Sequence, residues 1–209
     1  MRRILVINPN SNESVTEGLR HTLARYVGVA SIQCCTISEG PFGIESDANY
    51  AAVQPLIIEK INVSPGYDSY VIACYSDPAL ASCRRLFGQH VFGVQRSAVE
   101  KAATLGGKFG VLALSQSSIA RHVEYISSLG YNDRLAAEIP LNITVDQSAN
   151  NPTTIEKAIA GGLRLVNEFG ASSVILGCAG MAHAREAVEK EVGVPVIEPV
   201  SAAVDQALD

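Results

Sequence analysis

The sequence predicts an α/β protein made of two pseudo-symmetric halves, each a parallel sheet flanked by helices, with the functional site in the cleft between them. Two pairs of similar segments predict this fold. Residues 68–74 and 172–178 are each a short β-branched apolar run that ends in a cysteine and leads into a turn. Residues 4–11 and 110–117 are each an apolar run that leads into a polar turn. Such runs are typical of strands buried on both faces of a sheet.

Strands and helices alternate along the chain. The apolar runs predict strands at residues 3–8, 29–36, 69–74, 91–94, 109–114, 135–143, 172–177 and 194–197. The clearest helical patterns between them lie at residues 13–27, 49–63, 118–130 and 153–169. The last of these follows Pro152 and ends near Gly170, which are typical helix boundaries. Alternation of this kind predicts parallel sheets with right-handed crossovers.

We predict that residues 1–94 form the first half and residues 95–198 the second. A final helix at 200–208 could pack back on the first half, which would then include residues 199–209. No low-complexity tract or long linker interrupts the chain. We therefore expect the two halves to lie tightly together rather than to be tethered.

Composition narrows the class of protein. The chain has 209 residues and is 47% hydrophobic, which is enough to form packed cores. A net charge of -5 without any cluster of lysine and arginine argues against binding to nucleic acid or to an anionic membrane. No segment has the roughly 18 uninterrupted apolar residues of a membrane span, and the first strand begins too early for a signal peptide. We expect a cytoplasmic protein whose partner is a small molecule.

Cys74 and Cys178 are the candidate catalytic residues. Each stands at the carboxyl end of a predicted strand, where open α/β sheets bind their ligands. Because cysteine is among the most often buried residue types, either thiol alone could simply pack in a core. Equivalent positions in two similar halves instead predict one site with a sulfur on each side. A thiolate and a thiol on opposite faces of a carbon can remove a proton from one side and deliver one to the other, which inverts the carbon.

Two further expectations concern these thiols. Each should have a lowered pKa, because free backbone N–H groups at a following helix N-terminus stabilise a thiolate. If both sulfurs flank one carbon at reacting distances of about 3 to 3.5 Å, they should lie roughly 7 Å apart.

The other three cysteines, Cys34, Cys35 and Cys83, are assigned to packing. Five cysteines at irregular spacing do not indicate a disulfide framework. A zinc site is not supported either, because no cysteine pair has the spacing of zinc ligands and no histidine stands at a strand end. Glycine-rich nucleotide motifs are absent, and no lysine at a strand end suggests pyridoxal phosphate. We expect no cofactor and no metal.

Loops at other strand ends supply candidate substrate-binding residues. Asn8, Asn10 and Ser11 precede a predicted helix, where amides and backbone N–H groups can bind a carboxylate or a ring carbonyl. Capping of that helix is an equally good explanation for them. Ile44 belongs to the loop at 40–45, which follows the second strand. The residues beside the two cysteines complete the candidate set: Tyr75, Ser76, Gly177, Ala179 and Gly180.

Four strand-end loops together resemble the aspartate/glutamate/hydantoin racemase superfamily, and most closely its hydantoin and allantoin racemase branch. These loops lie at residues 7–12, 40–45, 73–78 and 176–182. The resemblance implies two pseudo-symmetric α/β halves and proton transfer by the two cysteines without a cofactor.

The chain also departs from the pattern of that branch. The branch usually has Cys-Phe-Gly-Asp-Pro-Gly where residues 74–79 read Cys-Tyr-Ser-Asp-Pro-Ala, which adds hydroxyl groups near the site. Its usual Thr-Thr pair falls on Ala113 and Leu114. Arg96 is either an added cation in the site or a solvent-facing helix residue.

The resulting functional prediction is an isomerase, a racemase or epimerase that acts on a carbon next to a carbonyl in a hydantoin, in allantoin or in an amino acid. One alternative is an enzyme similar to maleate isomerase or arylmalonate decarboxylase, members of the same superfamily in which cysteine is a nucleophile or the sole proton donor. Another is a non-catalytic module that binds a small molecule, since fold alone does not determine function. We also expect a homo-oligomer.

Overall fold

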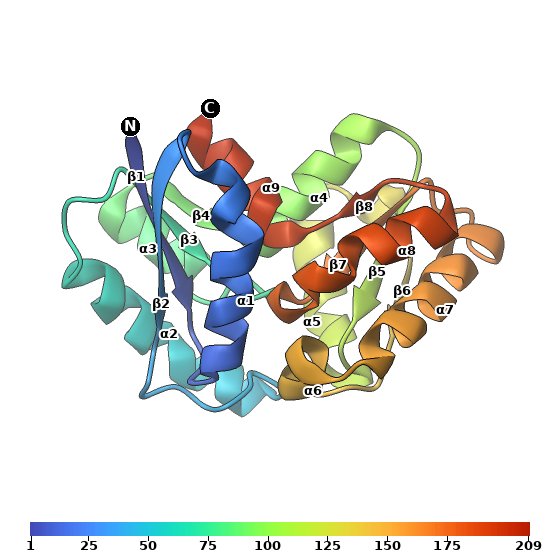
Figure 1. Cartoon of the computed structure of the whole chain (residues 1–209), viewed down its shortest axis with the longest axis horizontal. Helices are drawn as coiled ribbons and strands as arrows, with labels where there is room; N and C mark the ends of the chain where they lie inside the picture. Colours follow the sequence, from blue (N-terminus) through green and yellow to red (C-terminus); the bar gives the residue numbers. More distant parts are fainter.

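The computed structural model describes residues 1–209, and its strands form two parallel four-stranded sheets (Figure 1). The first sheet has the order β2-β1-β3-β4 and consists of β1 (Arg2–Asn8), β2 (Ala30–Thr36), β3 (Ser69–Ile72) and β4 (Val91–Gly93). The second has the order β6-β5-β7-β8 and consists of β5 (Phe109–Ala113), β6 (Leu135–Pro140), β7 (Ser173–Gly177) and β8 (Val196–Ile197). The same order in both sheets makes the halves equivalent, and the predicted fold class is confirmed.

Helices flank both sheets. They are α1 (Glu13–Leu23), α2 (Asp47–Asn62), α3 (Leu80–Phe87), α4 (Val94–Leu105), α5 (Gln116–Ser128), α6 (Val145–Asn150), α7 (Thr153–Asn167), α8 (Arg185–Val192) and α9 (Pro199–Leu208). Short 3₁₀ helices lie at Ala24–Tyr26, Asn132–Arg134 and Ala179–Ala184.

The apolar strands form because each is covered on both faces. In β1, Ile4 and Val6 belong to one core cluster, and the alternate residues Leu5 and Ile7 belong to another. This alternation follows from the period of two in a strand, which directs successive side chains to opposite faces. All five residues of β7 are buried. The carboxyl ends of β1 and β7 therefore project from sheets that are packed on both faces.

The C-terminal helix α9 joins the halves. It follows β8 of the second sheet, yet Val200, Ala203 and Val204 pack in the same core cluster as Ile4 of the first sheet. The helix also packs against α4 (Figure 1). The division of the chain at residues 94 and 198 stays a prediction.

The predicted strand at 135–143 is shorter in the structure, and the helix α6 that follows was not predicted. β6 ends at Pro140, and Asn142 adopts a positive φ of 51° that turns the chain. Thr144 and Gln147 then form a reciprocal capping box that starts α6. This helix brings new side chains to the region of the strand ends.

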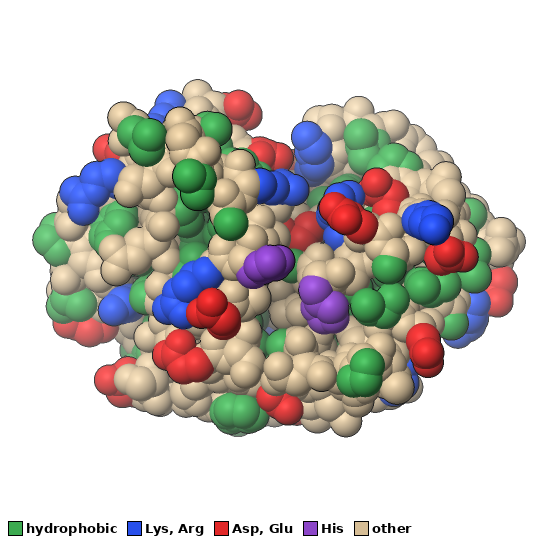
Figure 2. All heavy atoms as spheres, viewed as in Figure 1, with side chains coloured by type: hydrophobic (Ala, Val, Ile, Leu, Met, Phe, Trp, Pro, Cys, Tyr) green, Lys and Arg blue, Asp and Glu red, His purple; other side chains and the backbone are tan.

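The surface shows no strong segregation of charge on the face seen in Figure 2, where acidic and basic side chains are interspersed. None of the helices combines the length and the apolar character that crossing a bilayer requires. The cytoplasmic location and the homo-oligomeric state stay predictions.

Candidate active site

Cys74 and Cys178 line one cavity between the two sheets. Cys74 follows the end of β3, and Cys178 follows the end of β7, the equivalent strand of the second sheet. Both are free thiols, Cys178 buried and Cys74 partly buried. The cavity has a volume of about 130 Å³. That is about ten times the space that holds one water, so a small organic molecule could enter.

Most of the predicted site residues line this cavity together with the thiols. They are Asn10, Ile44, Tyr75, Ser76, Gly177, Ala179 and Gly180. The lining also contains residues that were not predicted: Val15, Glu45, Ala73, Leu114, Ser115, Ser118, Arg121, His122, Ile143 and Val145.

Two predicted residues, Asn8 and Ser11, do not line the cavity. The Asn8 side chain is fully buried, and its amide donates to Asn10 Oδ1 at 3.0 Å and to Thr16 Oγ1 at 3.0 Å. The backbone N–H of Ser11 donates to the Pro41 carbonyl at 2.9 Å. Both residues shape the loop that presents Asn10.

The Cys178 sulfur is held by two polar groups. The backbone N–H of Gly180 donates to Sγ at 3.4 Å, and Ser148 Oγ lies 3.4 Å from the same sulfur. Ser148 comes from α6 and also donates to the Val145 carbonyl at 2.6 Å. A Cβ at position 180 would lie 2.4 Å from Ser148 Oγ, so only glycine permits this close approach.

The expectation of lowered thiol pKa values is wrong. Burial raises the pKa of Cys74, and a negative charge on Cys178 would raise it further. Burial likewise raises the pKa of Cys178, although the hydrogen bonds from Ser148 and Gly180 act in the opposite direction. Cys74 is followed by a turn rather than a helix, since α3 begins only at Leu80. Cys178 does cap a 3₁₀ helix, but desolvation outweighs that benefit.

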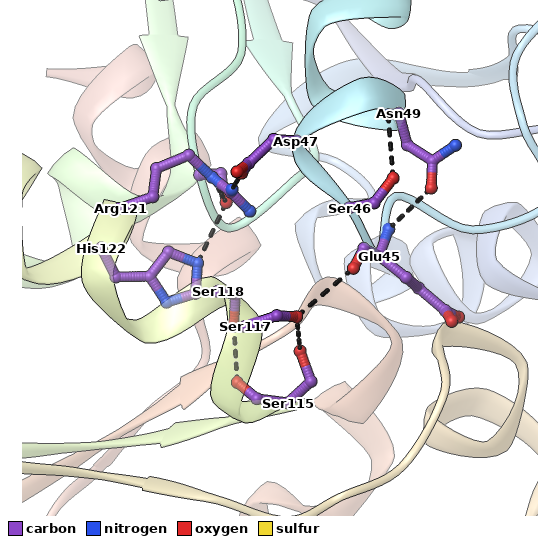
Figure 3. A network of polar contacts seen from close by, with 10 residues as sticks. Glu45, Ser46, Asp47, Asn49, Ser115, Ser117, Ser118, Arg121 and His122 are labelled. Atoms are coloured by element: carbon purple, nitrogen blue, oxygen red, sulfur yellow. Dashed lines mark hydrogen bonds and ion pairs between the residues drawn. The ribbon is translucent and has the colours of Figure 1, made fainter.

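Arg121 supplies the positive charge at the cavity. It forms an ion pair with Asp47 (Figure 3). Its Nε also donates to Ser76 Oγ at 3.4 Å. Arg96 does not line the cavity and instead pairs with Glu100 at 2.8 Å. The suggestion that Arg96 adds a cation to the site is therefore not supported.

Glu45 supplies a negative charge at the same cavity. Its Oε1 accepts the backbone N–H of Val145, at the first residue of α6, at 2.8 Å. Its backbone carbonyl accepts a hydrogen bond from Ser117 at the start of α5 (Figure 3). Glu45 thus ties the loop after β2 to two elements of the second half while it faces the cavity.

His122 lines the cavity, whereas Asp77 lies outside its lining. His122 contacts Ser76 Oγ through Nε2 at 3.0 Å and Glu138 through Nδ1 at 2.5 Å. Asp77 is buried, and its two carboxylate oxygens accept the backbone N–H groups of Gln95 and Arg96, each at 2.8 Å. Asp77 thus caps α4 from the loop that carries Cys74.

No group of three or more His, Cys, Asp or Glu side chains is arranged to hold a metal ion. The cavity lining offers two thiols, a carboxylate, a guanidinium, an imidazole and hydroxyl groups.

Comparison with known proteins identifies the family and the fold. Residues 4–207 match the model of the Asp/Glu/Hydantoin racemase family. A hydantoin racemase of Pseudomonas sp. strain NS671 is 33% identical over 208 residues, a match that covers 97% of this chain and 83% of the relative. An allantoin racemase from Klebsiella pneumoniae superposes with a TM-score of 0.93 at 28% identity, over 99% of this chain and 86% of that one. Maleate cis-trans isomerase from Nocardia farcinica shares the fold, with a TM-score of 0.77 at 18% identity over 100% and 93% of the two chains. The resemblance indicated by the four strand-end loops is confirmed.

Proposed function

Because the chain belongs to the Asp/Glu/hydantoin racemase family, we propose that it is a cofactor-independent racemase in which Cys74 and Cys178 form the acid/base pair. The observation that carries the proposal is the shared cavity, with one free thiol from the end of each sheet. Its relatives support the predicted class of enzyme, an isomerase of the racemase type.

In this mechanism the thiolate of one cysteine removes the proton from one face of a carbon next to a carbonyl. The electron pair of the broken C–H bond moves into the carbonyl to give an enolate, and the other thiol delivers a proton to the opposite face. The roles exchange for the other enantiomer. Because burial raises the pKa of both thiols, each thiolate is scarce but strongly basic once formed.

Cys178 is the better candidate for the thiolate of the free enzyme. Ser148 and the N–H of Gly180 both favour its charged form. The charge of Arg121 favours that of Cys74, but burial, Cys178 and Asp77 all oppose it.

A neutral cyclic ureide, either a hydantoin or allantoin, suits the cavity better than a free amino acid. A carboxylate on the substrate opposes formation of a carbanion beside it, which demands strong electrostatic compensation. The Glu45 carboxylate in the lining would oppose such a substrate further. We assign the contacts with the ring to Asn10, Ile44, Tyr75, Ser76, Gly177, Ala179 and Gly180, and leave Asn8 and Ser11 as supports of the loop.

The test is a polarimetric screen without added cofactor. The optical rotation of four substrates is followed: L-5-benzylhydantoin, a single enantiomer of allantoin, L-aspartate and L-glutamate. Each is tested with wild-type protein and with a Cys74→Ala/Cys178→Ala double variant. We expect loss of optical rotation with a cyclic ureide and the wild-type protein alone. Release of carbon dioxide from an arylmalonate, or conversion of maleate to fumarate, with no racemisation would instead assign one of the alternative reactions. Binding of a ureide with no turnover would assign a binding module.

A further inference from the structure

A chain of three hydrogen-bonding side chains runs from the cavity wall into the second half. Ser76, two residues after Cys74, lines the cavity and lies 3.0 Å from His122 Nε2. His122 Nδ1 lies 2.5 Å from Glu138 Oε1. Ser76 belongs to the loop after β3, whereas His122 and Glu138 belong to α5 and β6. The chain therefore crosses from one half of the molecule to the other.

The inner two members are deeply buried. The side chains of His122 and Glu138 are only 2% and 1% exposed. The Tyr75 ring packs edge-on against the imidazole, with ring centroids 5.1 Å apart, and the second carboxylate oxygen of Glu138 has no partner. Burial of a carboxylate with so few partners disfavours a net charge, and burial indeed raises the pKa of Glu138 while His122 lowers it.

The proton count of this pair decides the direction of the outer hydrogen bond. If the buried pair of Glu138 and His122 has no net charge, it carries two protons in all. One of them lies between the Glu138 carboxylate and His122 Nδ1. If Glu138 is ionised, the imidazolium donates from both nitrogens. If Glu138 is protonated, it donates to Nδ1, and the ring proton resides on Nε2. In both arrangements Nε2 carries a proton, so Ser76 Oγ must accept it.

The Ser76 hydroxyl hydrogen is then free to point into the cavity. We propose that His122 and Glu138 are positioning residues that hold the Ser76 hydroxyl as a hydrogen-bond donor to the carbonyl oxygen of the ligand. The proposal rests on the proposed function, in which this oxygen gains negative charge as the carbon loses its proton. A donor held in place before the reaction stabilises such a charge without having to reorient. The His122 N–H behind it strengthens the donor through cooperative polarisation.

The serine explains why the buried pair is useful here. His122 itself lines the cavity, and the hydroxyl at position 76 gives its imidazole a donor that it can orient toward the ligand. The nearby Arg121 Nε donates toward the same oxygen at 3.4 Å, which also leaves the Ser76 hydrogen free to face the ligand.

Nuclear magnetic resonance tests the proton position without any need for activity. Wild-type protein is prepared with ¹⁵N-labelled histidine, and the His122 signals are assigned by their loss in His122→Gln. We expect Nε2 to show the shift of a protonated nitrogen at pH 7. The shift of an unprotonated Nε2 would overturn the proposal, whether or not the protein is a racemase.

Kinetics with L-5-benzylhydantoin then tests the consequence for catalysis. Ser76→Ala should lower kcat about 100-fold with a smaller change in KM, the typical effect of losing one such donor. His122→Phe, which keeps a ring against Tyr75 but has no N–H, should lower kcat by a similar factor. His122→Gln, which retains an N–H near Ser76, should recover part of the loss.

The double variant separates positioning from simple structural support. Added to Ser76→Ala, His122→Phe should lower kcat less than about threefold further, because residues that act through one another are not additive. Equal losses in both backgrounds would overturn the proposal. His21→Phe is the matched control, since this exposed histidine does not line the cavity and should leave kcat unchanged. Circular dichroism confirms that each variant is folded.

Discussion

The hydroxyl of Ser148 is the side-chain contact that the structure gives to the Cys178 sulfur, at 3.4 Å. Its single hydrogen is directed to the Val145 carbonyl at 2.6 Å when the thiol is protonated, which leaves the oxygen to accept from S–H. Rotation of the hydroxyl would let it donate to the thiolate instead. One serine can thus accompany the sulfur through both of its protonation states.

Ser148→Ala should therefore raise the pKa of Cys178. Hydrogen bonds to charged groups contribute about 1.5 to 3 kcal/mol, so the acidic limb of the kcat/KM profile should move up by about one to two pH units and activity at pH 7 should fall about 10- to 100-fold. Stopped assays from pH 6 to 10 measure the shift. Ser127→Ala on the exposed side of α5 is the control, and an unmoved profile for Ser148→Ala would contradict the assigned contact.

Glu45→Gln should have the opposite effect. The Glu45 charge raises the pKa of Cys178 in addition to burial, whereas a glutamine keeps an oxygen that can accept the Val145 N–H. The active form of the base is the thiolate, so kcat/KM rises with pH until the pKa of the base is passed. Removal of the charge lowers that pKa, and the acidic limb should move to lower pH. A shift to higher pH would show that the carboxylate assists the base rather than opposes it.

Each cysteine variant should lose net inversion in both directions. In Cys74→Ala or Cys178→Ala the missing group is the acid in one direction and the base in the other. The remaining thiol can still exchange the proton of the one enantiomer that it faces. Proton NMR in D₂O should show deuterium entering a single enantiomer, the opposite one for each variant. Near-normal racemisation by either folded variant would refute the two-base assignment.

At the scale of elements, the sequence patterns located the central strands because a strand that is buried on both faces requires a nearly continuous apolar run. All of the eight predicted strands are present, with small shifts at their ends. The error at 141–144 has a local cause. Leu141 and Ile143 are apolar and alternate with polar residues, as in a strand, and their N–H groups still donate to the ends of β5. The positive φ of Asn142 turns the chain there, and no period in the sequence signals it.

The predicted part of the candidate site lies in strand-end loops. The missed residues are partly in such loops, Glu45 among them, and partly on helices. Cys74, Ser76 and Cys178 directly follow strand ends, so their order along the chain predicts their proximity. Arg121 and His122 lie on α5, where one histidine on an amphipathic helix has no distinguishing pattern. Their role depends on contacts with the other half, which only the packing of the two sheets determines. The thiol pKa values were misjudged for the same reason, because the depth of burial is a property of that packing.

Asp77 links two elements, and its substitution should loosen α4. Gly93, the residue before α4, has no side chain to cap the helix, and Asp77 supplies both acceptors from the loop after β3. Asparagine tolerates the positive φ of 46° at this position but can accept only one of the two N–H groups. Asp77→Asn should lower the free energy of unfolding by about 1 to 3 kcal/mol.

Urea titration measures this change. The exposed Asp133→Asn is the matched control and should have little effect. A stability equal to wild type would mean that the first turn of α4 is satisfied in another way.

At the scale of the whole molecule, the halves are joined on opposite sides of the cavity. Near the strand ends, Asn12 Nδ2 donates to Asp146 Oδ1 at 3.1 Å, and Glu45 accepts from Val145. Beyond them, α9 leaves the second sheet and fills the core of the first. The thiols therefore keep their relative positions only while both halves are folded. The site depends on both halves together.

Ala203→Asp tests whether the halves unfold together. Ala203 is fully buried on α9 in the cluster that contains Ile4, so an unpaired carboxylate there should lower the free energy of unfolding by more than about 3 kcal/mol. Because α9 contacts both sheets, hydrogen exchange measured by mass spectrometry should show β1 and β5 losing protection to the same degree. Ala52→Asp on the exposed side of α2 is the matched control and should retain wild-type protection in both strands. If β5 kept its protection while β1 exchanged, the second half would be stable by itself, and α9 would serve the first half alone.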